Sequence, residues 1–175
     1  NLPLPMKIKK ILPVLLLFVA SSTYSVALEV AGYTFSAPKE WKSVPPSSNM
    51  RKGQFEVSGQ SGGKADVVFF HFGSGGAGGV QANVDRWMKQ FEVPLEKKVQ
   101  TETLEGIKVT YAQAHGTFLS GRPFGPKTPN PGFALMAAII EGKQGAIFIK
   151  MTGPKETVES NSDLVKKMVG SSLKK

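Results

Sequence analysis

The sequence ADVVFFHFGSGGAGGVQANVDRWMKQF, residues 65–91, changes its hydrophobic period halfway along. Residues 65–72 are nearly all apolar, which is typical of a central strand covered on both faces. A glycine loop, Gly73–Gly79, follows. The remaining residues have the helical period, and their apolar side chains form one stripe: Val80, Val84, Trp87, Met88 and Phe91. The stretch therefore predicts a strand, a loop and a helix that packs on the sheet.

Further extended segments lie on both sides of this unit. Four prolines between residues 120 and 132 predict a long loop, and Pro154 suits the first turn of a closing helix. The stretch Ser160-Asn161-Ser162 contains poor helix formers. Alternating or apolar patterns predict strands at residues 28–31, 33–36, 50–58, 98–104, 107–119, 133–140 and 146–152.

Tight turns join most consecutive strands, so we expect a mainly antiparallel sheet. The predicted fold class is α+β, with about six to eight strands packed against two helices in an α/β/α sandwich. No internal repeat or linker interrupts the pattern, and residues 28–175 are expected to form a single domain.

Composition limits the possible functions. The chain has 175 residues, 22 Lys plus Arg, 13 Asp plus Glu and a net charge of +9. The absence of Cys excludes disulfides, thiolate metal sites, cysteine nucleophiles and a lipidated cysteine anchor. The basic residues are spread along the chain in pairs. This distribution has two explanations: it keeps the protein soluble, or it serves to bind an acidic partner.

The first 27 residues have the pattern of an export signal, preceded by five upstream residues. Met6 is the expected start, lysines follow, and residues 11–20 form an apolar run. Small residues predict cleavage between Ala27 and Leu28. We therefore expect a periplasmic or secreted protein with no stable membrane anchor after cleavage; an uncleaved amphipathic anchor is the alternative. Nucleic acid is a poor partner outside the cytoplasm.

The glycine loop permits two interpretations. Gly73, Gly75 and Gly78 match G-x-G-x-x-G, but the parallel strand and acidic residue of a dinucleotide site are missing. The loop precedes a helix, so the amides of Gly75, Gly76, Gly78 and Gly79 could bind a small anion. The other interpretation is a tight turn that brings the helix close to the sheet.

Polar side chains near this loop are candidate ligand- or partner-binding residues. Asn83 and Arg86 are expected on the polar side of the helix, together with Gln90. Arg51, which lies on a neighbouring predicted strand, could bind the same anion. Arg122 and Lys127 lie in the proline-rich loop, which is either a binding loop or a stiff connector.

No catalytic constellation is visible in the sequence. Ser61 lies in a G-x-S-x-G match, but its context is a turn between two strands and not a nucleophile elbow. His71 and His115 fall in separate predicted strands, without the spacing of a metal site. We therefore predict no cofactor and no metal. An enzyme becomes plausible if either histidine lies beside a carboxylate in a concave pocket.

The chain resembles a group of uncharacterised exported bacterial proteins and, more remotely, the Mog1/PsbP-like fold. The resemblance spans most of residues 33–173. The motifs that carry it are Phe35-x-x-Pro38-x-x-Trp41, Met50-Arg51, Phe69-Phe70-His71-Phe72-Gly73, Asn83-x-x-Arg86-Trp87-x-x-Gln90-Phe91 and Thr152-Gly153-Pro154. Mog1-like members bind a small GTPase and PsbP-like members are extrinsic photosystem subunits, but a shared fold transfers neither role.

Two functional hypotheses follow. The first is a non-enzymatic exported interaction or accessory protein whose partner is an unknown envelope protein. The alternative is a protein that binds a small anionic ligand at the Gly73–Gly79 loop.

Overall fold

The computed structural model describes residues 25–93, 96–122 and 124–174. Seven strands form one antiparallel sheet in the order β3-β4-β5-β9-β8-β7-β6, and β1 and β2 form a separate two-stranded sheet. The strands are β1 Ala27–Val30, β2 Tyr33–Ser36, β3 Lys42–Ser43, β4 Arg51–Ser58, β5 Lys64–His71, β6 Glu96–Leu104, β7 Ile107–Ser120, β8 Thr128–Gly142 and β9 Gly145–Pro154. The helices are α1 Val80–Met88 and α2 Lys155–Leu173.

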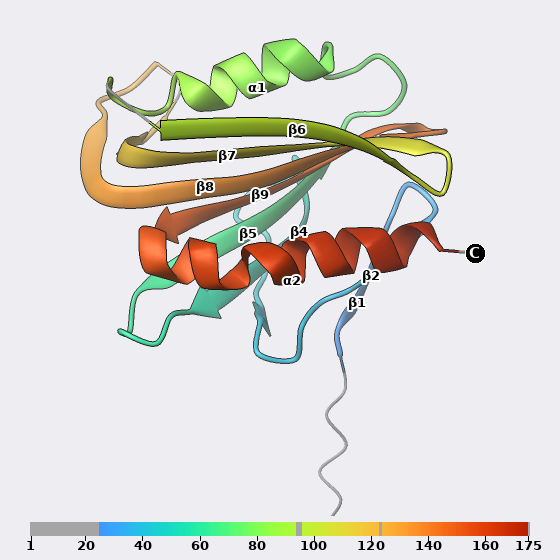
Figure 1. The fold of residues 1–175 in the computed structure, drawn as a ribbon, viewed down its shortest axis with the longest axis horizontal. Coiled ribbons are helices and arrows are strands. Elements are labelled where there is room, and N and C mark those ends of the chain that lie inside the picture. The colour runs from blue at the N-terminus through green and yellow to red at the C-terminus, as the bar shows by residue number, and fades with distance from the viewer. Residues whose placement is uncertain (1–24, 94–95, 123, 175) are drawn as a thin grey trace, which may run out of the picture.

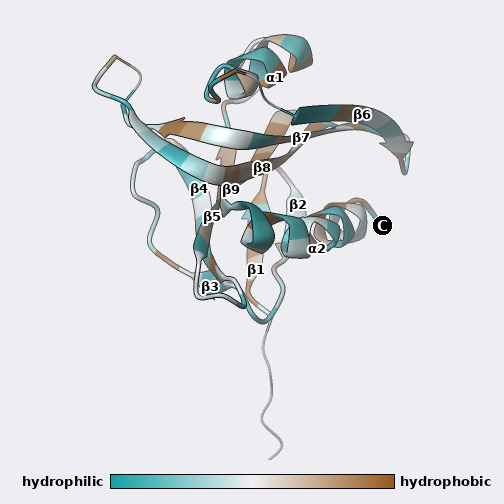
Figure 2. Cartoon of the chain, turned by 60° about the vertical axis from the view of Figure 1, so that its left-hand side comes forward, coloured by the Kyte–Doolittle hydropathy of each residue, from teal (hydrophilic) through white to brown (hydrophobic). Residues whose placement is uncertain are grey.

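The two helices lie on opposite faces of the large sheet (Figure 1). This arrangement confirms the predicted α+β sandwich. One core layer lies between the sheet, α2 and the β1–β2 pair, and a smaller layer lies under α1. The central strand β8 is buried on both faces from Ala134 to Ile140. Figure 2 shows hydrophobic colouring along β8 and β9, whereas much of β6 at the edge is hydrophilic.

Each tryptophan belongs to a different layer. Trp41 is 3% exposed and packs in the α2 layer, where its indole N–H donates a hydrogen bond to Asn161 Oδ1 at 3.0 Å. Trp87 lies on α1 and meets Phe148 of β9 edge to face. Neither ring is available as a ligand-stacking surface.

The predicted loop over residues 120–132 is too long. β8 already begins at Thr128, which pairs with Ser120, so the connection is only residues 121–127. β9 ends opposite Phe133, so β8 has a neighbour on one side only before that residue. Prolines are tolerated at such an edge position. The Asn130 side chain adds hydrogen bonds to the carbonyls of Phe118 and Thr128.

The other differences are local. α1 ends at Met88 and not at Phe91, which instead makes an isolated bridge to Phe118. The strand predicted over residues 65–72 ends one residue earlier and is fully covered only in its middle, because Asp66 is exposed and Phe72, just beyond β5, is 43% exposed. The short strand β3 was not predicted. Most of the predicted signal peptide, residues 1–24, lies outside the described residues.

The poor helix formers of α2 do not interrupt it. Asn161 donates a side-chain hydrogen bond to the carbonyl of Thr157, and Ser162 donates one to the carbonyl of Val158. Such bonds to the preceding turn accommodate short polar side chains inside a helix. Asn161 is also the residue that accepts the Trp41 hydrogen bond, so its polarity contributes to tertiary contact.

Tyr111 on β7 has an unsatisfied group in the core. Its side chain is 5% exposed, and its hydroxyl has no hydrogen-bond partner among the described residues. Burial, and secondly the charge of Glu102, raise the pKa of Tyr111 to about 12. A buried polar group without a partner costs free energy of folding.

We therefore expect Tyr111→Phe to leave the free energy of unfolding unchanged or to raise it by about 1 kcal/mol. Urea denaturation of the two proteins measures the difference. Tyr111→Ala serves as the control, because loss of the ring should cost about 3 to 5 kcal/mol. A clear loss of stability in Tyr111→Phe would show that the hydroxyl has a partner.

Candidate functional site

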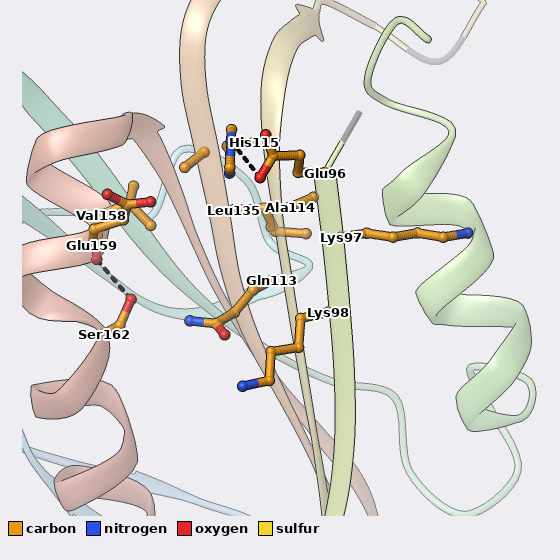
Figure 3. Close-up of a pocket in the computed structure, with 11 residues that line it drawn as sticks. Glu96, Lys97, Lys98, Gln113, Ala114, His115, Leu135, Val158, Glu159 and Ser162 are labelled. Carbon is orange, nitrogen blue, oxygen red and sulfur yellow. Dashed lines mark hydrogen bonds and ion pairs between the residues drawn. The ribbon is translucent and has the colours of Figure 1, made fainter. Parts of the chain in front are cut away.

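A concave pocket lies between α2 and the β6 edge of the sheet, on the α2 face (Figure 3). Its volume is about 200 Å³. We call it the α2–β6 groove. Glu96 and Lys98 come from β6, Gln113 and His115 from β7, and Val158, Glu159 and Ser162 from α2.

Strand register explains which side chains reach the groove. Glu96 pairs with His115 and Lys98 pairs with Gln113 across β6 and β7. Paired residues project to the same face, and successive residues alternate between faces. Lys97 accordingly points toward α1, away from the other lining side chains, in Figure 3. The alternation thus places Glu96, Lys98 and Glu102 on the α2 face and Lys97 on the α1 face.

His115 lies at one end of the groove, between groups of opposite charge. Its Nε2 atom is 3.3 Å from Glu96 Oε2 and 3.1 Å from Lys155 Nζ. A protonated Nε2 donates to the carboxylate, whereas an unprotonated Nε2 accepts from the lysine ammonium. The Nε2 atom therefore has two alternative hydrogen-bond partners, one as a donor and one as an acceptor. The sequence offered no local signal for this cluster, because its three members are far apart in the chain.

The same surface continues along α2 beyond the pocket. Residues at positions 155, 159, 162 and 166 recur at helical spacing and share one face. At the far end, Lys166 Nζ lies 5.6 Å from the centre of the Tyr111 ring. Lysine and glutamate side chains thus alternate along the helix side of the groove.

The groove places a histidine beside a carboxylate in a concave pocket, which is the arrangement that would favour an enzyme. Other features do not support catalysis. The Glu96 side chain is 82% exposed, and Ser162 Oγ donates to the backbone of Val158 and not to a base. Ser61 lies in the β4–β5 turn and donates to Glu156, so the turn interpretation of its motif is confirmed. The described residues contain no cluster of metal-ligating side chains.

The glycine loop lies on the opposite face, before α1. Gly76 packs directly on the end of β5, because a Cβ atom there would lie 2.1 Å from the carbonyl oxygen of Phe72. Gly75 and Gly78 have φ angles of +75° and +74°, which favour glycine. Gly79 is the N-cap residue of α1. Packing and backbone conformation thus explain much of the glycine content, and anion binding by these amides stays a prediction.

Asn83 does not lie on the polar side of α1, as the helical pattern predicted. It is 3% exposed, and its side-chain amide donates to the carbonyls of Ala77 and Gly79, both at 2.9 Å. It therefore holds the loop against the helix. Arg86 is exposed in the last turn of α1, where a cation interacts favourably with the helix dipole.

Arg51 shares the α1 face of the sheet with a residue that the sequence analysis missed, Lys150. Arg51 pairs with Phe70, and Lys150 pairs with Val68, on the two sides of β5. Lys150 Nζ donates to Gln90 Oε1 and lies 5.3 Å from the centre of the Phe118 ring. Burial, and secondly the positive charge of Arg51, lower the pKa of Lys150 to about 8.

These two cations have no carboxylate within ion-pair distance among the described residues. Arg51 instead donates to Gln54 Oε1 at 2.9 Å. The signal for Lys150 was present in the sequence: it is a single lysine in an otherwise apolar strand, Ala146–Thr152.

Arg122 and Lys127 lie in the connection between β7 and β8, at the end of the sheet opposite the glycine loop. Both are exposed, and Lys127 Nζ donates to the carbonyl of Arg122 at 2.6 Å. The structure therefore does not bring together all the predicted binding residues. Arg51 and the glycine loop lie at one end of the sheet, and Arg122 and Lys127 lie at the other.

The His71 side chain contacts the backbone of the neighbouring strand. Its Nδ1 atom lies 3.1 Å from the carbonyl oxygen of Ala146 on the neighbouring strand β9. His71 and His115 are on strands separated by β9 and β8, so they do not share a site.

The chain has a PsbP-like fold. Its structure resembles the solution structure of cyanobacterial PsbP (CyanoP) from Synechocystis sp. PCC 6803, with a TM-score of 0.54, 13% sequence identity, and coverage of 88% of this chain and 94% of that one. A protein of unknown function, PA94 from Pseudomonas aeruginosa, described as a putative regulator, matches with a TM-score of 0.40 and 13% identity over 85% of this chain and 95% of that one. No family model and no curated protein sequence matches.

The likeness to CyanoP confirms the predicted PsbP-like fold. At 13% identity it establishes the fold alone, because a fold hosts many functions. No helix within the described ranges is long and apolar enough to cross a membrane.

The packing role of the glycine loop can be tested with two alanine substitutions. We expect Gly76→Ala to lower the free energy of unfolding by about 2 kcal/mol or more, because the new methyl group meets a backbone carbonyl. Gly79→Ala is the matched control: a Cβ atom there meets nothing within 4 Å, and we expect a loss below about 1 kcal/mol. Thermal and urea unfolding measure both effects, and equal stabilities of the two variants would contradict the packing role.

Proposed function

We propose that this protein is an exported accessory protein that binds a partner protein through the α2–β6 groove. The observation that carries the proposal is the convergence of polar side chains from three elements on one open groove: the charged residues Glu96, Lys98, Lys155 and Glu159, together with His115. Groups of both signs arranged along a surface favour recognition of a complementary charged surface.

The size and lining of the groove favour a protein partner over an enclosed small molecule. Pockets for drug-sized ligands usually have volumes of about 300 to 1,000 Å³ and mostly apolar walls. This groove has about 200 Å³, and seven of its eleven lining residues are charged or polar. A partner's side chains can enter such a groove without complete enclosure. Rim charges of this kind contribute mainly to specificity and association rate.

Export is part of the same proposal. The basic and apolar segments before residue 25, followed by small residues up to Ala27, support secretion into the periplasm or beyond. The partner is then an envelope or extracellular protein. The PsbP-like fold agrees with an accessory role but does not identify the partner.

A capture experiment with matched variants tests the groove. The purified protein is immobilised and exposed to envelope extract of the source organism, alongside the double variant His115→Ala/Lys155→Ala. We expect a specific partner on the wild type and at least about a tenfold lower recovery on the double variant, since both removed groups lie at one end of the groove.

The control is Lys42→Ala, which removes an exposed charge on β3, at the other edge of the sheet. It should recover the partner as the wild type does. Equal recovery on the groove variant, or no specific partner on the wild type, would overturn the proposal.

A second candidate function is the binding of a small anion, and Arg51 with Lys150 favours it. Both cations lie on the α1 face of the sheet, with Lys150 Nζ at Gln90 just beyond the C-terminal end of α1, and neither has an ion-pair partner among the described residues. Phosphate, sulfate and carboxylates are the probes, and thermal unfolding is the measurement. A ligand at 100 times its dissociation constant adds about 2.7 kcal/mol of stability. Melting temperatures that stay constant across the panel would exclude this function.

Lys150 also predicts a dependence of stability on pH. Its pKa of about 8 in the folded protein is below the ordinary lysine value of 10.5, so the unfolded chain binds more protons between these two values. Stability from this group therefore rises as the pH increases from about 8 to 10. We expect the wild type to gain about 1 to 3 kcal/mol relative to Lys150→Met over this interval. Urea denaturation at several pH values measures the difference, and parallel profiles would contradict the lowered pKa.

A further inference from the structure

The outer edge of β6 is the longest open strand edge in the described part of the chain. β6 has nine residues, is the last strand of the sheet, and has exposed side chains at eight of the nine positions. Its only strand neighbour among the described residues is β7. Backbone groups on such an edge are a template for pairing with another strand.

We propose that β6 pairs with β6 of a second copy of this chain, antiparallel and centred on Gln100. The two seven-stranded sheets would then join across a twofold axis into one continuous sheet. An interface of this kind is isologous, so the same nine residues serve both copies.

The β6–β7 turn determines which backbone groups are available. Leu104 pairs with Ile107, and the two turn residues Glu105 and Gly106 have φ angles of +49° and +77°. This is the conformation of a two-residue hairpin, in which the flanking residues exchange both hydrogen bonds. Even-numbered residues of β6 therefore bond to β7, and odd-numbered residues present their N–H and C=O groups outward. Pairing centred on Gln100 places odd-numbered residues of one copy opposite odd-numbered residues of the other. The outward N–H and C=O groups of the two strands can therefore bond to one another.

Charge complementarity selects this centre. It places Lys98 opposite Glu102 of the second copy, and Glu102 opposite the other copy's Lys98. Both pairs occupy positions without backbone hydrogen bonds between the copies, where opposing side chains lie closer together. Opposite charges at facing positions stabilise a pair of strands. Lysines on edge strands normally discourage pairing, but here each lysine meets an acid.

Neighbouring registers lack this match. A centre at Val99 would place Glu96 opposite Glu102 twice, and like charges at facing positions are destabilising. A centre at Thr101 would place Lys98 opposite Leu104 and Glu102 opposite Gln100, so both Lys–Glu pairs would be lost. The centre at Gln100 also brings Val99, which is 45% exposed, opposite Thr101 of the second copy. These are β-branched residues that suit a sheet.

Helix α2 leaves space for the second copy. It packs over β8, β9 and β2, and β6 stays exposed on both faces. Figure 1 shows β7 and β8 between β6 and α2. The α2–β6 grooves of the two copies would lie on the same face of the joined sheet. This inference goes beyond the proposed function, which needs only one copy.

Sedimentation equilibrium of the purified full chain tests the proposal, at concentrations up to about 1 mM. We expect a concentration-dependent dimer. Glu102→Lys places two lysines opposite each other at both ends of the interface and should raise the dimer dissociation constant at least about tenfold. Lys98→Glu should do the same with acids. The double variant Lys98→Glu/Glu102→Lys restores both pairs and should dimerise as the wild type does.

Lys42→Glu is the control for charge reversal away from β6, and it should leave the dissociation constant unchanged. The two side chains exchanged in β6, Lys98 and Glu102, are exposed, so the fold should persist in every variant; circular dichroism checks this. Hydrogen exchange gives a second measurement, because the outward amides of Val99 and Thr101 should be protected only in the dimer. A monomer at every concentration, or a double variant that fails to restore dimerisation, would overturn the proposal.

Discussion

Burial of β8 on both faces is the constraint on which the other parts of the structure depend. From Ala134 to Ile140 every residue of this strand is at most 3% exposed. One helix cannot cover both faces of a sheet, so the chain needs α1 on one face and α2 with the β1–β2 pair on the other. The helices also bury side chains of the strands beside β8. The number of buried side chains per strand falls toward the edges of the sheet. The polar features therefore lie where the helices end: the α2–β6 groove on one face, and Arg51 with Lys150 on the other.

The position of β6 illustrates how this constraint produces a surface for binding. A strand at the edge gains little from burial, so its sequence can be polar on both faces. Alternation then distributes its charges between the two sides of the sheet. Only the charged side chains on the α2 face lie near the lysine and glutamate side chains of α2. The groove thus results from a long edge strand that continues beyond its covering helix, and it requires no special loop.

Much of the fold could be predicted from the sequence, because apolar periods and turn residues are local signals. The hairpin at Glu105-Gly106 and the amphipathic α1 are examples. The site was much less predictable. Asn83 shares its helical face with polar residues, yet it is buried because the preceding loop folds over it. The cluster of Glu96, His115 and Lys155 depends on the register of β6 and β7 and on the placement of α2, which no local pattern contains. Residues 128–132 were interpreted as loop because prolines usually end strands, although an edge position permits them.

The distribution of the two tryptophans has a practical consequence. Trp41 reports on the layer between the sheet and α2, and Trp87 reports on the layer under α1, on the other face of the sheet. Each layer therefore contains its own intrinsic fluorophore. In single-tryptophan forms of the protein, emission spectra recorded during unfolding would separate the melting of one layer from that of the other. The small α1 layer and the larger α2 layer can thus be compared as cooperative units without an added label.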